Sequence, residues 1–415
     1  MKSKITFLLL SLIPSFASAQ WNQVRYDQVN YYAKAYAITE SSVVVAGMDQ
    51  MSSGAFFMRT NDGGLTWDSI SVSSPSVSYQ FEALKFTDMN TGYAGGIKNN
   101  LQALVKTIDN GSTWSEVTPD TASLNAIKSI SFVDQQYGFA ATRYNIYKTV
   151  DGGSTWITMN VPAINMEDIY FVDMNTGYAG GENAMHAELY KTTDGGATWY
   201  NVMTATIPTL FMTGSRKIDA VSATTIFTSL LYSNILLRTM DGGLTWDTLT
   251  VPQIYEVQDY DFINVLSGHV LSSMGEIFGT SDGGVTWNYE YSVAGGAYGP
   301  SVFLSSISFV DDIGYVCGSS GLIKKHDPSV TSIIESERGN SIYIYPNPAV
   351  QNELINFNIN VKNIKFYNCN GQTILSKELN GSALSLMDPD LKPGIYNVVA
   401  SDDINFFNAK LIIAE

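Results

Sequence analysis

Six aspartates recur through this sequence and are the most conspicuous candidates for chemistry. They are Asp62, Asp109, Asp151, Asp194, Asp241 and Asp282. Carboxylates can bind calcium or transfer protons, but a calcium loop needs several oxygen ligands within one short segment. Each of these segments offers one carboxylate, and six equivalent segments indicate six separate places. We therefore interpret the six aspartates as turn residues, and we predict neither a metal site nor a cofactor.

Other acidic residues could serve a different chemistry. Glycosidases act through a pair of carboxyl groups, and Glu167, Asp168, Asp259, Asp261 and Glu276 supply such groups. Nothing in their spacing selects one pair. A glycoside hydrolase that acts on polysaccharide therefore stays open as the alternative, while a non-catalytic protein is favoured.

Histidines and cysteines are scarce. His186, His269 and His326 fall in different repeats of the chain, and we interpret them as surface or turn residues. Cys317 and Cys369 fall in different expected domains, so we predict buried thiols and no disulfide. Two cysteines and three histidines cannot form a cysteine-rich zinc site.

A basic residue stands three positions before most of the six aspartates. These residues are Arg59, Lys106, Lys148, Lys191, Arg238 and, in a degenerate seventh copy, Lys324. A ring of cations could bind a polyanion. The simpler interpretation is a solvated strand position near each aspartate, where an ion pair contributes little.

The six aspartates belong to an eight-residue pattern, Thr-x-Asp-(Gly/Asn)-Gly-x-Thr-Trp, which we call the box. The tryptophans that close the boxes are Trp67, Trp114, Trp156, Trp199, Trp246 and Trp287, and Trp21 is a seventh without a box before it. Successive tryptophans are about 41–47 residues apart, a repeat length typical of propeller blades. Each unit between tryptophans reads as four short strands separated by turn residues.

The box has the composition of a tight turn between two strands. In Asp194-Gly195-Gly196, two adjacent glycines permit positive φ angles. The Asp carboxylate can accept hydrogen bonds from the N–H groups that follow it. The tryptophan then begins the next strand, where its ring can pack against a neighbouring sheet.

This pattern resembles the Asp-box repeat of sialidase-like, sortilin-like and photosystem-II-assembly-factor-like β-propellers. The resemblance covers six boxes and implies an all-β fold, and the segment Trp21 to Val24 supplies the strand missing from a seventh unit. We predict a seven-bladed propeller closed by its N-terminal strand. The Arg-Ile-Pro motif that opens sialidase propellers is missing, which argues against sialidase activity.

The chain ends in a region with a different pattern. We expect a signal peptide over residues 1–19, the propeller over 20–330, a polar linker over 331–341 and a small β-sandwich over 342–415. This last region resembles the type A C-terminal sorting domain of the type IX secretion system. The matching motifs contain Tyr345, Pro346, Asn347, Pro348, Gly394, Tyr396 and Lys410.

The resemblance implies a Bacteroidota-type cell, the type IX secretion machinery as a partner, and a location outside the cell or at the outer-membrane surface after passage through the periplasm. A formal net charge of −16 disfavours nucleic acid as a partner. The N-terminal apolar segment is too short for a membrane anchor, so we expect no transmembrane span in the mature chain.

A ligand is expected on the face opposite the boxes, where the links between repeats vary most. Candidate contacts there are Tyr79, Phe211, Arg216, Tyr255 and Tyr298. Aromatic side chains on loops can stack on sugars or anchor a protein partner. The favoured function is therefore a secreted or surface propeller that binds a protein or a glycan without catalysis.

Overall fold

The computed structural model describes residues 20–27, 30–49, 54–72, 77–119, 123–162, 164–183, 186–203, 215–293, 303–328, 344–345, 349–350, 354–367, 373–387, 391–401 and 406–414. The chain divides into two compact units, Met1–Thr331 and Ser332–Glu415. This division falls where the linker is expected. The expected signal peptide and the linker lie outside the described residues, so the predicted domain boundaries stay predictions.

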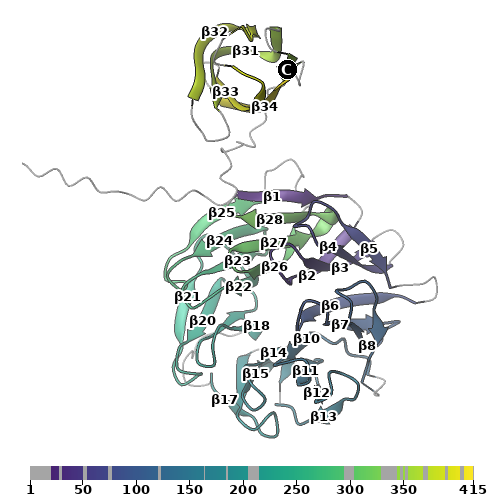
Figure 1. Ribbon diagram of the computed structural model, residues 1–415. Helices are drawn as coiled ribbons and strands as arrows, with labels where there is room; N and C mark the ends of the chain where they lie inside the picture. Colours follow the sequence, from purple (N-terminus) through teal and green to yellow (C-terminus); the bar gives the residue numbers. More distant parts are fainter. Residues whose placement is uncertain are drawn as a thin grey trace, which may run out of the picture. The chain divides into compact units, whose positions relative to one another are not determined.

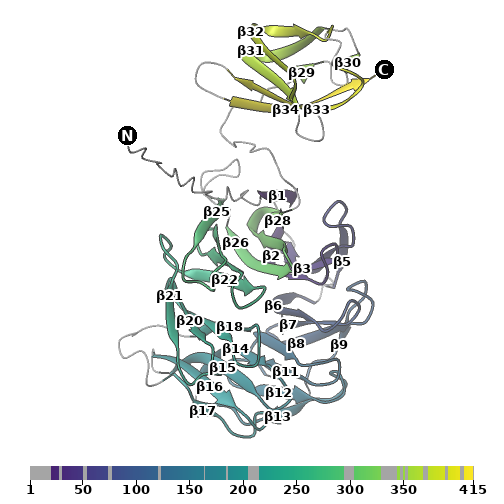
Figure 2. The same cartoon turned by 60° about the vertical axis from the view of Figure 1, so that its left-hand side comes forward.

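The described part of the first unit contains seven four-stranded antiparallel sheets, which are arranged in a ring (Figures 1 and 2). The first sheet is β2 (Asn30–Ala37), β3 (Val43–Asp49), β4 (Ala55–Thr60) and β5 (Asp68–Ser71). The second is β6 (Tyr79–Phe86), β7 (Gly92–Lys98), β8 (Leu101–Thr107) and β9 (Ser115–Glu116). The third is β10 (Ser129–Phe132), β11 (Gly138–Ala141), β12 (Ile146–Thr149) and β13 (Ile157–Met159).

The fourth sheet is β14 (Asn165–Phe171), β15 (Gly177–Asn183), β16 (His186–Thr192) and β17 (Tyr200–Asn201). The fifth is β18 (Ser215–Ala220), β19 (Ile226–Leu230), β20 (Ile235–Thr239) and β21 (Asp247–Thr250). The sixth is β22 (Val257–Phe262), β23 (Gly268–Ser272), β24 (Glu276–Thr280) and β25 (Asn288–Ser292). The first strand of each sheet faces the middle of the ring, and the last lies at its outside (Figure 1).

The seventh sheet joins the two ends of the propeller. It contains β26 (Leu304–Val310), β27 (Ile313–Gly318) and β28 (Ile323–Asp327), with a short 3-10 turn η1 (Ser319–Gly321) between the last two. Its outer strand is β1 (Gln20–Arg25), which pairs antiparallel with β28 and places Trp21 opposite His326. The expected closure by the N-terminal strand is confirmed. The number of sheets fits the predicted seven blades.

Aromatic rings pack between neighbouring sheets. Phe139 in the third sheet stacks on Phe171 in the fourth, with ring centres 3.4 Å apart, and Trp199 meets the edge of Phe171 at 6.0 Å. The same arrangement recurs where Phe227 stacks on Phe262 at 3.6 Å. Such pairs contribute about 0.5–1.5 kcal/mol beyond their burial. The spaced aromatic residues of the repeat thus form the contacts that hold successive sheets together.

In several sheets a glycine precedes the aromatic residue of the second strand and makes room for this packing. A Cβ atom at Gly177 would lie 2.6 Å from the ring of Phe171, and one at Gly138 would lie 2.3 Å from the ring of Phe132. These distances are too short for any side chain. The recurring Gly-aromatic pair is therefore set by close packing of the first strand on the second.

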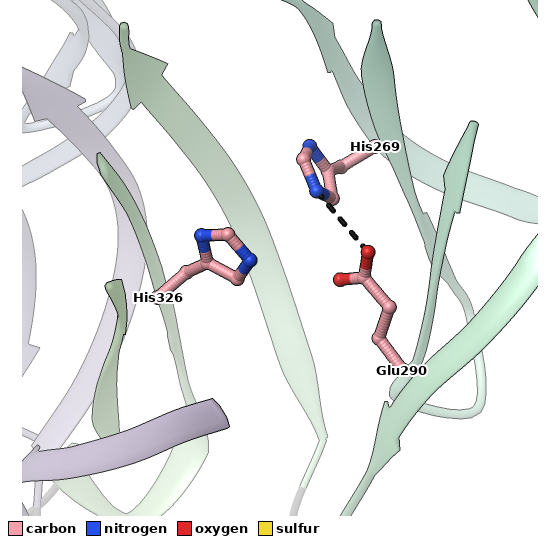
Figure 3. Close-up of side chains that lie close together, drawn as sticks. All are labelled: His269, Glu290 and His326. Atoms are coloured by element: carbon pink, nitrogen blue, oxygen red, sulfur yellow. Dashed lines mark ion pairs between the residues drawn. The ribbon is translucent and has the colours of Figure 1, made fainter. Parts of the chain in front are cut away.

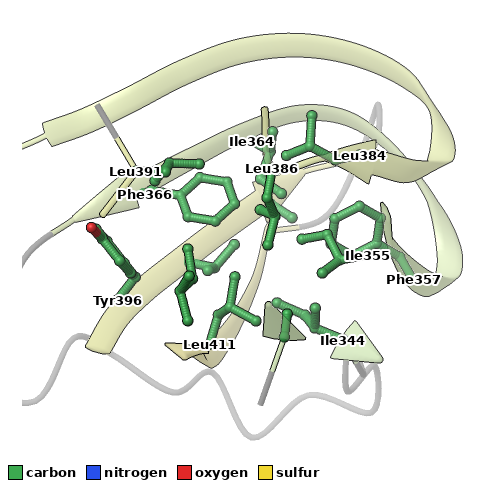
Figure 4. Close-up of a cluster of buried hydrophobic side chains, with 14 of the residues drawn as sticks. Ile344, Ile355, Phe357, Ile364, Phe366, Leu384, Leu386, Leu391, Tyr396 and Leu411 are labelled. Atoms are coloured by element: carbon green, nitrogen blue, oxygen red, sulfur yellow. The ribbon is translucent and has the colours of Figure 1, made fainter. Parts of the chain in front are cut away.

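The second unit is a six-stranded β structure. Its strands are β29 (Ile344–Tyr345), β30 (Ala349–Val350), β31 (Leu354–Tyr367), β32 (Thr373–Ser385), β33 (Gly394–Ser401) and β34 (Phe406–Ala414). The long strand β31 pairs with β29, β32 and β33. Figure 4 shows the strands curving around one apolar core, which includes Phe357, Ile364, Phe366 and Leu411. Within the described chain, no helix is long and apolar enough to cross a membrane.

Candidate functional site

Each box aspartate is the centre of a closed set of hydrogen bonds. In the fourth sheet, Asp194 Oδ1 accepts from Thr192 Oγ1 at 2.8 Å and from the Thr198 N–H at 2.9 Å, and Oδ2 accepts from Thr198 Oγ1 at 2.6 Å. Thr192 Oγ1 in turn accepts from the Gly196 N–H at 2.9 Å. Gly195 and Gly196 have φ angles of +72° and +90°. The turn thus uses both threonines of the pattern, and the two residues after the aspartate need positive φ angles, which Asn110 also adopts in the second sheet.

These hydrogen bonds favour the ionised aspartate. The hydrogen bond from the second threonine of each box is the largest contribution, and it helps lower the pKa of Asp62, Asp151, Asp194 and Asp241 to about 2. The pKa values of Asp109 and Asp282 are lowered for the same reason. The geometry supports the interpretation of the box aspartates as turn residues.

The basic residues before the boxes reach across to the next sheet. Lys106 Nζ donates to the Gly152 carbonyl at 2.7 Å, and Lys191 Nζ donates to the Gly242 carbonyl at 2.6 Å. Each acceptor lies in the box of the following sheet. These lysines therefore join each sheet to the next through a main-chain oxygen. The interpretation of these residues as solvated strand positions missed this role.

One member of this set was assigned incorrectly from the sequence. Lys325 pairs with Tyr315 as Lys191 pairs with Tyr178, so Lys325 occupies the equivalent position. Lys324 is instead buried and donates from Nζ to the Trp21 carbonyl at 3.2 Å. The degenerate seventh copy hid this shift of one residue.

A central cavity of about 610 Å³ runs along the inner strands of all seven sheets. Six inner strands contain a register shift at the same place, so one residue of each is unpaired in the sheet. These residues are Ala33, Glu82, Glu167, Arg216, Gln258 and Ser305. Of these residues, the polar Glu82, Glu167, Gln258 and Ser305 line the cavity.

Many polar groups in the cavity satisfy the inner edges of the sheets. The inner strand is the free edge of each sheet, and its unpaired N–H groups need acceptors. Asp168 Oδ2 accepts from the Ile218 N–H at 2.6 Å, and Asp259 Oδ2 accepts from the Ile307 N–H at 3.1 Å. Ser131, Asp219, Asp261 and Ser308 accept from the next inner strand in the same way. The aspartates of the cavity thus join one sheet to the next.

The structure brings together four of the five acidic residues considered for glycoside hydrolysis. Glu167, Asp168, Asp259 and Asp261 line the cavity. Glu276 lies elsewhere in the sixth sheet, where it accepts a hydrogen bond from Ser272. Sequence reasoning could not show that these four share one cavity, because they lie on two inner strands, β14 and β22, that are far apart in the chain.

Their environments differ. Burial raises the pKa of Asp168 to about 6, and burial together with the adjacent Asp219 raises that of Asp261 to about 7. Burial acts in the same direction on Asp259, but Lys217 lies 2.6 Å away, and its charge helps lower the Asp259 pKa to about 2. Asp259 is therefore a paired anion, and Asp168 and Asp261 are the groups that can hold a proton near neutral pH.

The first two sheets each place a charged side chain in the cavity. Lys34 and Glu82 both line the cavity, and neither forms a hydrogen bond or an ion pair with any residue that the structure describes. Lys128 and Glu167, by contrast, form an ion pair of 2.7 Å on the other side of Glu82. Sequence reasoning missed Lys34, Glu82, Lys128 and Lys217. Their signal was the recurrence of charged residues in and just before the inner strand of each sheet.

The residues predicted for a ligand face have different environments. Tyr255 is 74% exposed in the link between β21 and β22. Tyr79 belongs to β6, is 7% exposed and stacks on Phe81 at 5.5 Å, so its expected position on a loop is wrong. Arg216 lies in β18, and Phe211 and Tyr298 lie outside the described residues.

We call the end of the propeller that carries Tyr255 the link face. Because the strands alternate in direction, the links between sheets and the turns between second and third strands share this end, opposite the boxes. Tyr144 and Tyr232 lie in two of those turns and are 50% and 68% exposed. At the same end, Tyr31, Met48 and Gln80 line the cavity. Exposed aromatic rings and the cavity therefore share the link face.

The histidine interpretation was wrong for two of three residues. His269 on β23 and His326 on β28 are 7% and 5% exposed, and they lie close together although they belong to different sheets. His186 at the start of β16 is exposed, as expected. Cys317 is a buried free thiol, as predicted, and burial raises its pKa to about 12. Cys369 lies outside the described residues.

The sorting-domain motifs fall on the strands of the second unit. Tyr345 belongs to β29, Gly394 begins β33 and Lys410 belongs to β34, opposite Asn397. Tyr396 is buried, and its hydroxyl donates to the Lys392 carbonyl at 2.8 Å. Pro346, Asn347 and Pro348 lie outside the described residues.

Two family models match parts of the chain. Residues 343–414 match the secretion system C-terminal sorting domain, and residues 13–162 match the photosynthesis system II assembly factor YCF48. A search of curated protein sequences finds no significant match.

Solved structures share the fold. YCF48 bound to D1 peptide is 17% identical with a TM-score of 0.59, and the match covers 74% of this chain and 96% of that one. YCF48 from Cyanidioschyzon merolae is 17% identical with a TM-score of 0.57, covering 75% and 100%. The GH74 enzyme of Niastella koreensis is 14% identical with a TM-score of 0.56, covering 95% and 76%. At these identities the likeness shows the fold alone.

Proposed function

We infer that this YCF48-like β-propeller, whose type IX secretion sorting domain indicates export to the cell surface or secretion, binds a protein or a glycan without acting on it chemically. The binding site is the link face together with the adjoining mouth of the cavity. The observation that carries this proposal is a difference between groups in the cavity: its aspartates form hydrogen bonds that hold the sheets together, while Lys34 and Glu82 form no hydrogen bond or ion pair with the described residues.

The aspartates are poorly suited to catalysis because their oxygens already have structural partners. Asp168, Asp259 and Asp261 each accept a main-chain N–H from the next sheet. A catalytic acid or nucleophile must instead be free to reach a substrate atom. Use of these groups in a reaction would break hydrogen bonds that join the ring.

The mouth of the cavity suits a polar ligand. Lys34 supplies donors and Glu82 supplies acceptors, so together they can bind a peptide segment or the hydroxyl groups of a sugar. Tyr255, Tyr144 and Tyr232 add exposed aromatic surface on the same face. Aromatic side chains of this kind provide much of the binding energy at protein interfaces.

The test is binding by the full chain to arrays of bacterial and plant polysaccharides, and to extracellular proteins from its host by cross-linking. Once a ligand is found, Lys34→Ala and Glu82→Ala should each weaken binding about tenfold, which corresponds to about 1.4 kcal/mol. Lys377→Ala is the matched control, because Lys377 is an exposed lysine on β32 of the second unit. Unchanged affinity in both cavity variants would show that the ligand binds away from the mouth of the cavity.

A glycoside hydrolase is the second candidate, and one observation favours it. Asp168 and Asp261 have raised pKa values of about 6 and 7, which is the property of a general acid. Release of reducing sugar from polysaccharides by the full chain, abolished in Asp168→Asn or Asp261→Asn, would support hydrolysis and contradict the binding proposal.

A further inference from the structure

The junction between the sixth and seventh sheets departs from the repeat at three positions. His269 follows Gly268, where the fourth sheet has Tyr178 after Gly177. Gly279 pairs with His269 and so occupies the position of the basic residue Lys191. The sixth sheet thus lacks the tyrosine and the lysine that in the second and fourth sheets bind the glycine carbonyl of the next box.

The third departure lies on the facing strand. His326 pairs with Gly314 as Thr192 pairs with Gly177, so a histidine replaces the first threonine of the box. The seventh sheet therefore has an imidazole where the other sheets carry a hydroxyl, and it faces the second imidazole across the junction. The two ring centres are 5.2 Å apart.

Glu290 occupies the space that Gly279 leaves open. A Cβ atom at Gly279 would lie 2.1 Å from Glu290 Oε1, so any side chain at residue 279 would displace the carboxylate. Glu290 belongs to the outer strand β25 and points inward toward both histidines (Figure 3). The substitution of glycine for the usual cation thus admits an anion between two imidazoles.

The three side chains have the geometry of a metal-binding set. One donor atom from each of His269, Glu290 and His326 lies within 4.8 Å of the others. His269 Nε2 and Glu290 Oε1 are 3.3 Å apart (Figure 3). Two ligands of a tetrahedral zinc ion, each about 2.0–2.1 Å from the metal, are separated by about 3.3 Å. This pair therefore already has the spacing that zinc requires.

Surrounding groups hold the donors in place and leave them available. His326 Nδ1 is 3.0 Å from the Asp312 carbonyl, which directs its Nε2 toward the other two residues (Figure 3). Trp21 Nε1 donates to Glu290 Oε2 at 3.1 Å. His269 stacks on Phe309, with ring centres 4.0 Å apart, and its buried Nδ1 has no hydrogen-bond partner among the described residues.

We propose that His269, Glu290 and His326 bind a divalent transition-metal ion, with Zn²⁺ as the best fit. Two imidazoles and one carboxylate match the donors that zinc prefers, and they leave a fourth position for water. The ion would join the sixth sheet to the seventh beside Trp21 of β1. Its role is to fasten the junction next to the strand that closes the ring.

The test uses the full chain purified without a polyhistidine tag, treated with a chelator and dialysed. Addition of Zn²⁺ should give a single tightly bound ion per chain by elemental analysis and should raise Tm by several degrees, because a ligand that binds only the folded state stabilises it. Co²⁺ should bind at the same place and show the visible spectrum of a tetrahedral site.

Three variants identify the ligands. Glu290→Gln keeps the size of the side chain but removes its charge, and His326→Ala removes one imidazole. Gly279→Ala displaces Glu290 without altering any donor. Each should lower zinc affinity at least tenfold, while His186→Ala, which removes an exposed histidine, should leave it unchanged.

The variants are compared only after circular dichroism shows that each is folded. The proposal is overturned if the stripped wild-type chain binds no more zinc than Glu290→Gln and shows no metal-dependent rise in Tm. It is also overturned if His186→Ala abolishes binding and the junction variants do not.

Discussion

Asp261 Oδ2 accepts a hydrogen bond from the main-chain N–H of Phe309 at 2.7 Å, across the gap between the sixth and seventh sheets. Two inner strands that share no sheet are joined in this way. The same exchange occurs between most neighbouring sheets, so the polar cavity is a structural element of the ring. A ligand can therefore bind in the cavity only through side chains that take no part in the hydrogen bonds between sheets.

The first prediction tests this relationship. Asp261→Ala leaves the Phe309 N–H without its acceptor and should destabilise the propeller by about 1–3 kcal/mol. Asp261→Asn keeps an acceptor of the same shape. Burial and Asp219 raise the Asp261 pKa to about 7. Between about pH 4 and 7 the folded chain therefore holds a proton on Asp261 that the unfolded chain has released. The free energy of unfolding of the propeller should fall as pH rises through this range.

The two variants should therefore behave oppositely at high pH. Urea unfolding at pH 8 should show Asp261→Asn at least as stable as wild type and Asp261→Ala less stable. At pH 5 the advantage of the asparagine variant should shrink. Equal destabilisation by both variants at pH 8 would mean that the carboxylate is needed as an anion.

The second prediction concerns the box threonine. Thr192→Val removes a buried hydroxyl that donates to Asp194 and accepts from the Gly196 N–H. Loss of both bonds at nearly constant volume should cost about 1–3 kcal/mol in urea unfolding. Thr193→Val is the matched control, since Thr193 is exposed and takes no part in these bonds. A difference below measurement error between the two variants would contradict the role assigned to Thr192.

The third prediction is acid sensitivity. Hydrogen bonds lower the pKa of Asp62, Asp151, Asp194 and Asp241 to about 2, below the usual value of about 3.9. Their contribution to stability is present above pH of about 4 and is lost as pH falls toward 2. Tm should therefore drop steeply between pH 4 and 2. Asp194→Asn should make the drop shallower, and an unchanged slope would argue against the lowered pKa of Asp194.

The fourth prediction concerns ring closure. Deletion of residues 21–24 removes most of β1 and exposes the edge of β28. An exposed edge can pair with another chain, so the shortened protein should have a lower Tm and form oligomers in size-exclusion chromatography with light scattering. A monomer with wild-type Tm would show that closure by β1 is dispensable.

The fifth prediction concerns export. Deletion of residues 342–415 should leave a folded propeller that accumulates in the periplasm, because the two units have separate cores. Cell fractionation measures the change. Fusion of these residues and a signal peptide to an unrelated protein should carry that protein outside in a host with type IX secretion. Normal export of the shortened chain would contradict the assignment of the tail.

The fold was predictable because each box is a local structure. Asp194, Thr198 and the intervening glycine are neighbours in sequence, and their turn repeats at nearly constant spacing. Trp21 could be assigned to the last sheet because it matches the other tryptophans. The error at Lys324 arose where the box is degenerate and a shift of one residue has no visible marker.

The candidate sites were harder to predict because they depend on contacts between repeats. Lys34 and Glu82 lie on different inner strands, and the register shifts that bring them to one cavity leave no mark in composition. His269 and His326 come from different sheets. An alignment of the repeats by strand register would have shown that His326 replaces a threonine kept in all six boxes and that only the sixth sheet has a histidine at the position of His269.

The pairing of β1 with β28 also determines when the protein can finish folding. Trp21 and Lys324 are joined by a hydrogen bond although 303 positions separate them in the chain. Such distant contacts slow folding, because the intervening segment must be ordered before they form. The strand β1 therefore cannot take its place until β28, about 300 residues later in the chain, has been synthesised. Until residue 328 is available, the chain carries an open sheet edge that needs protection from other chains.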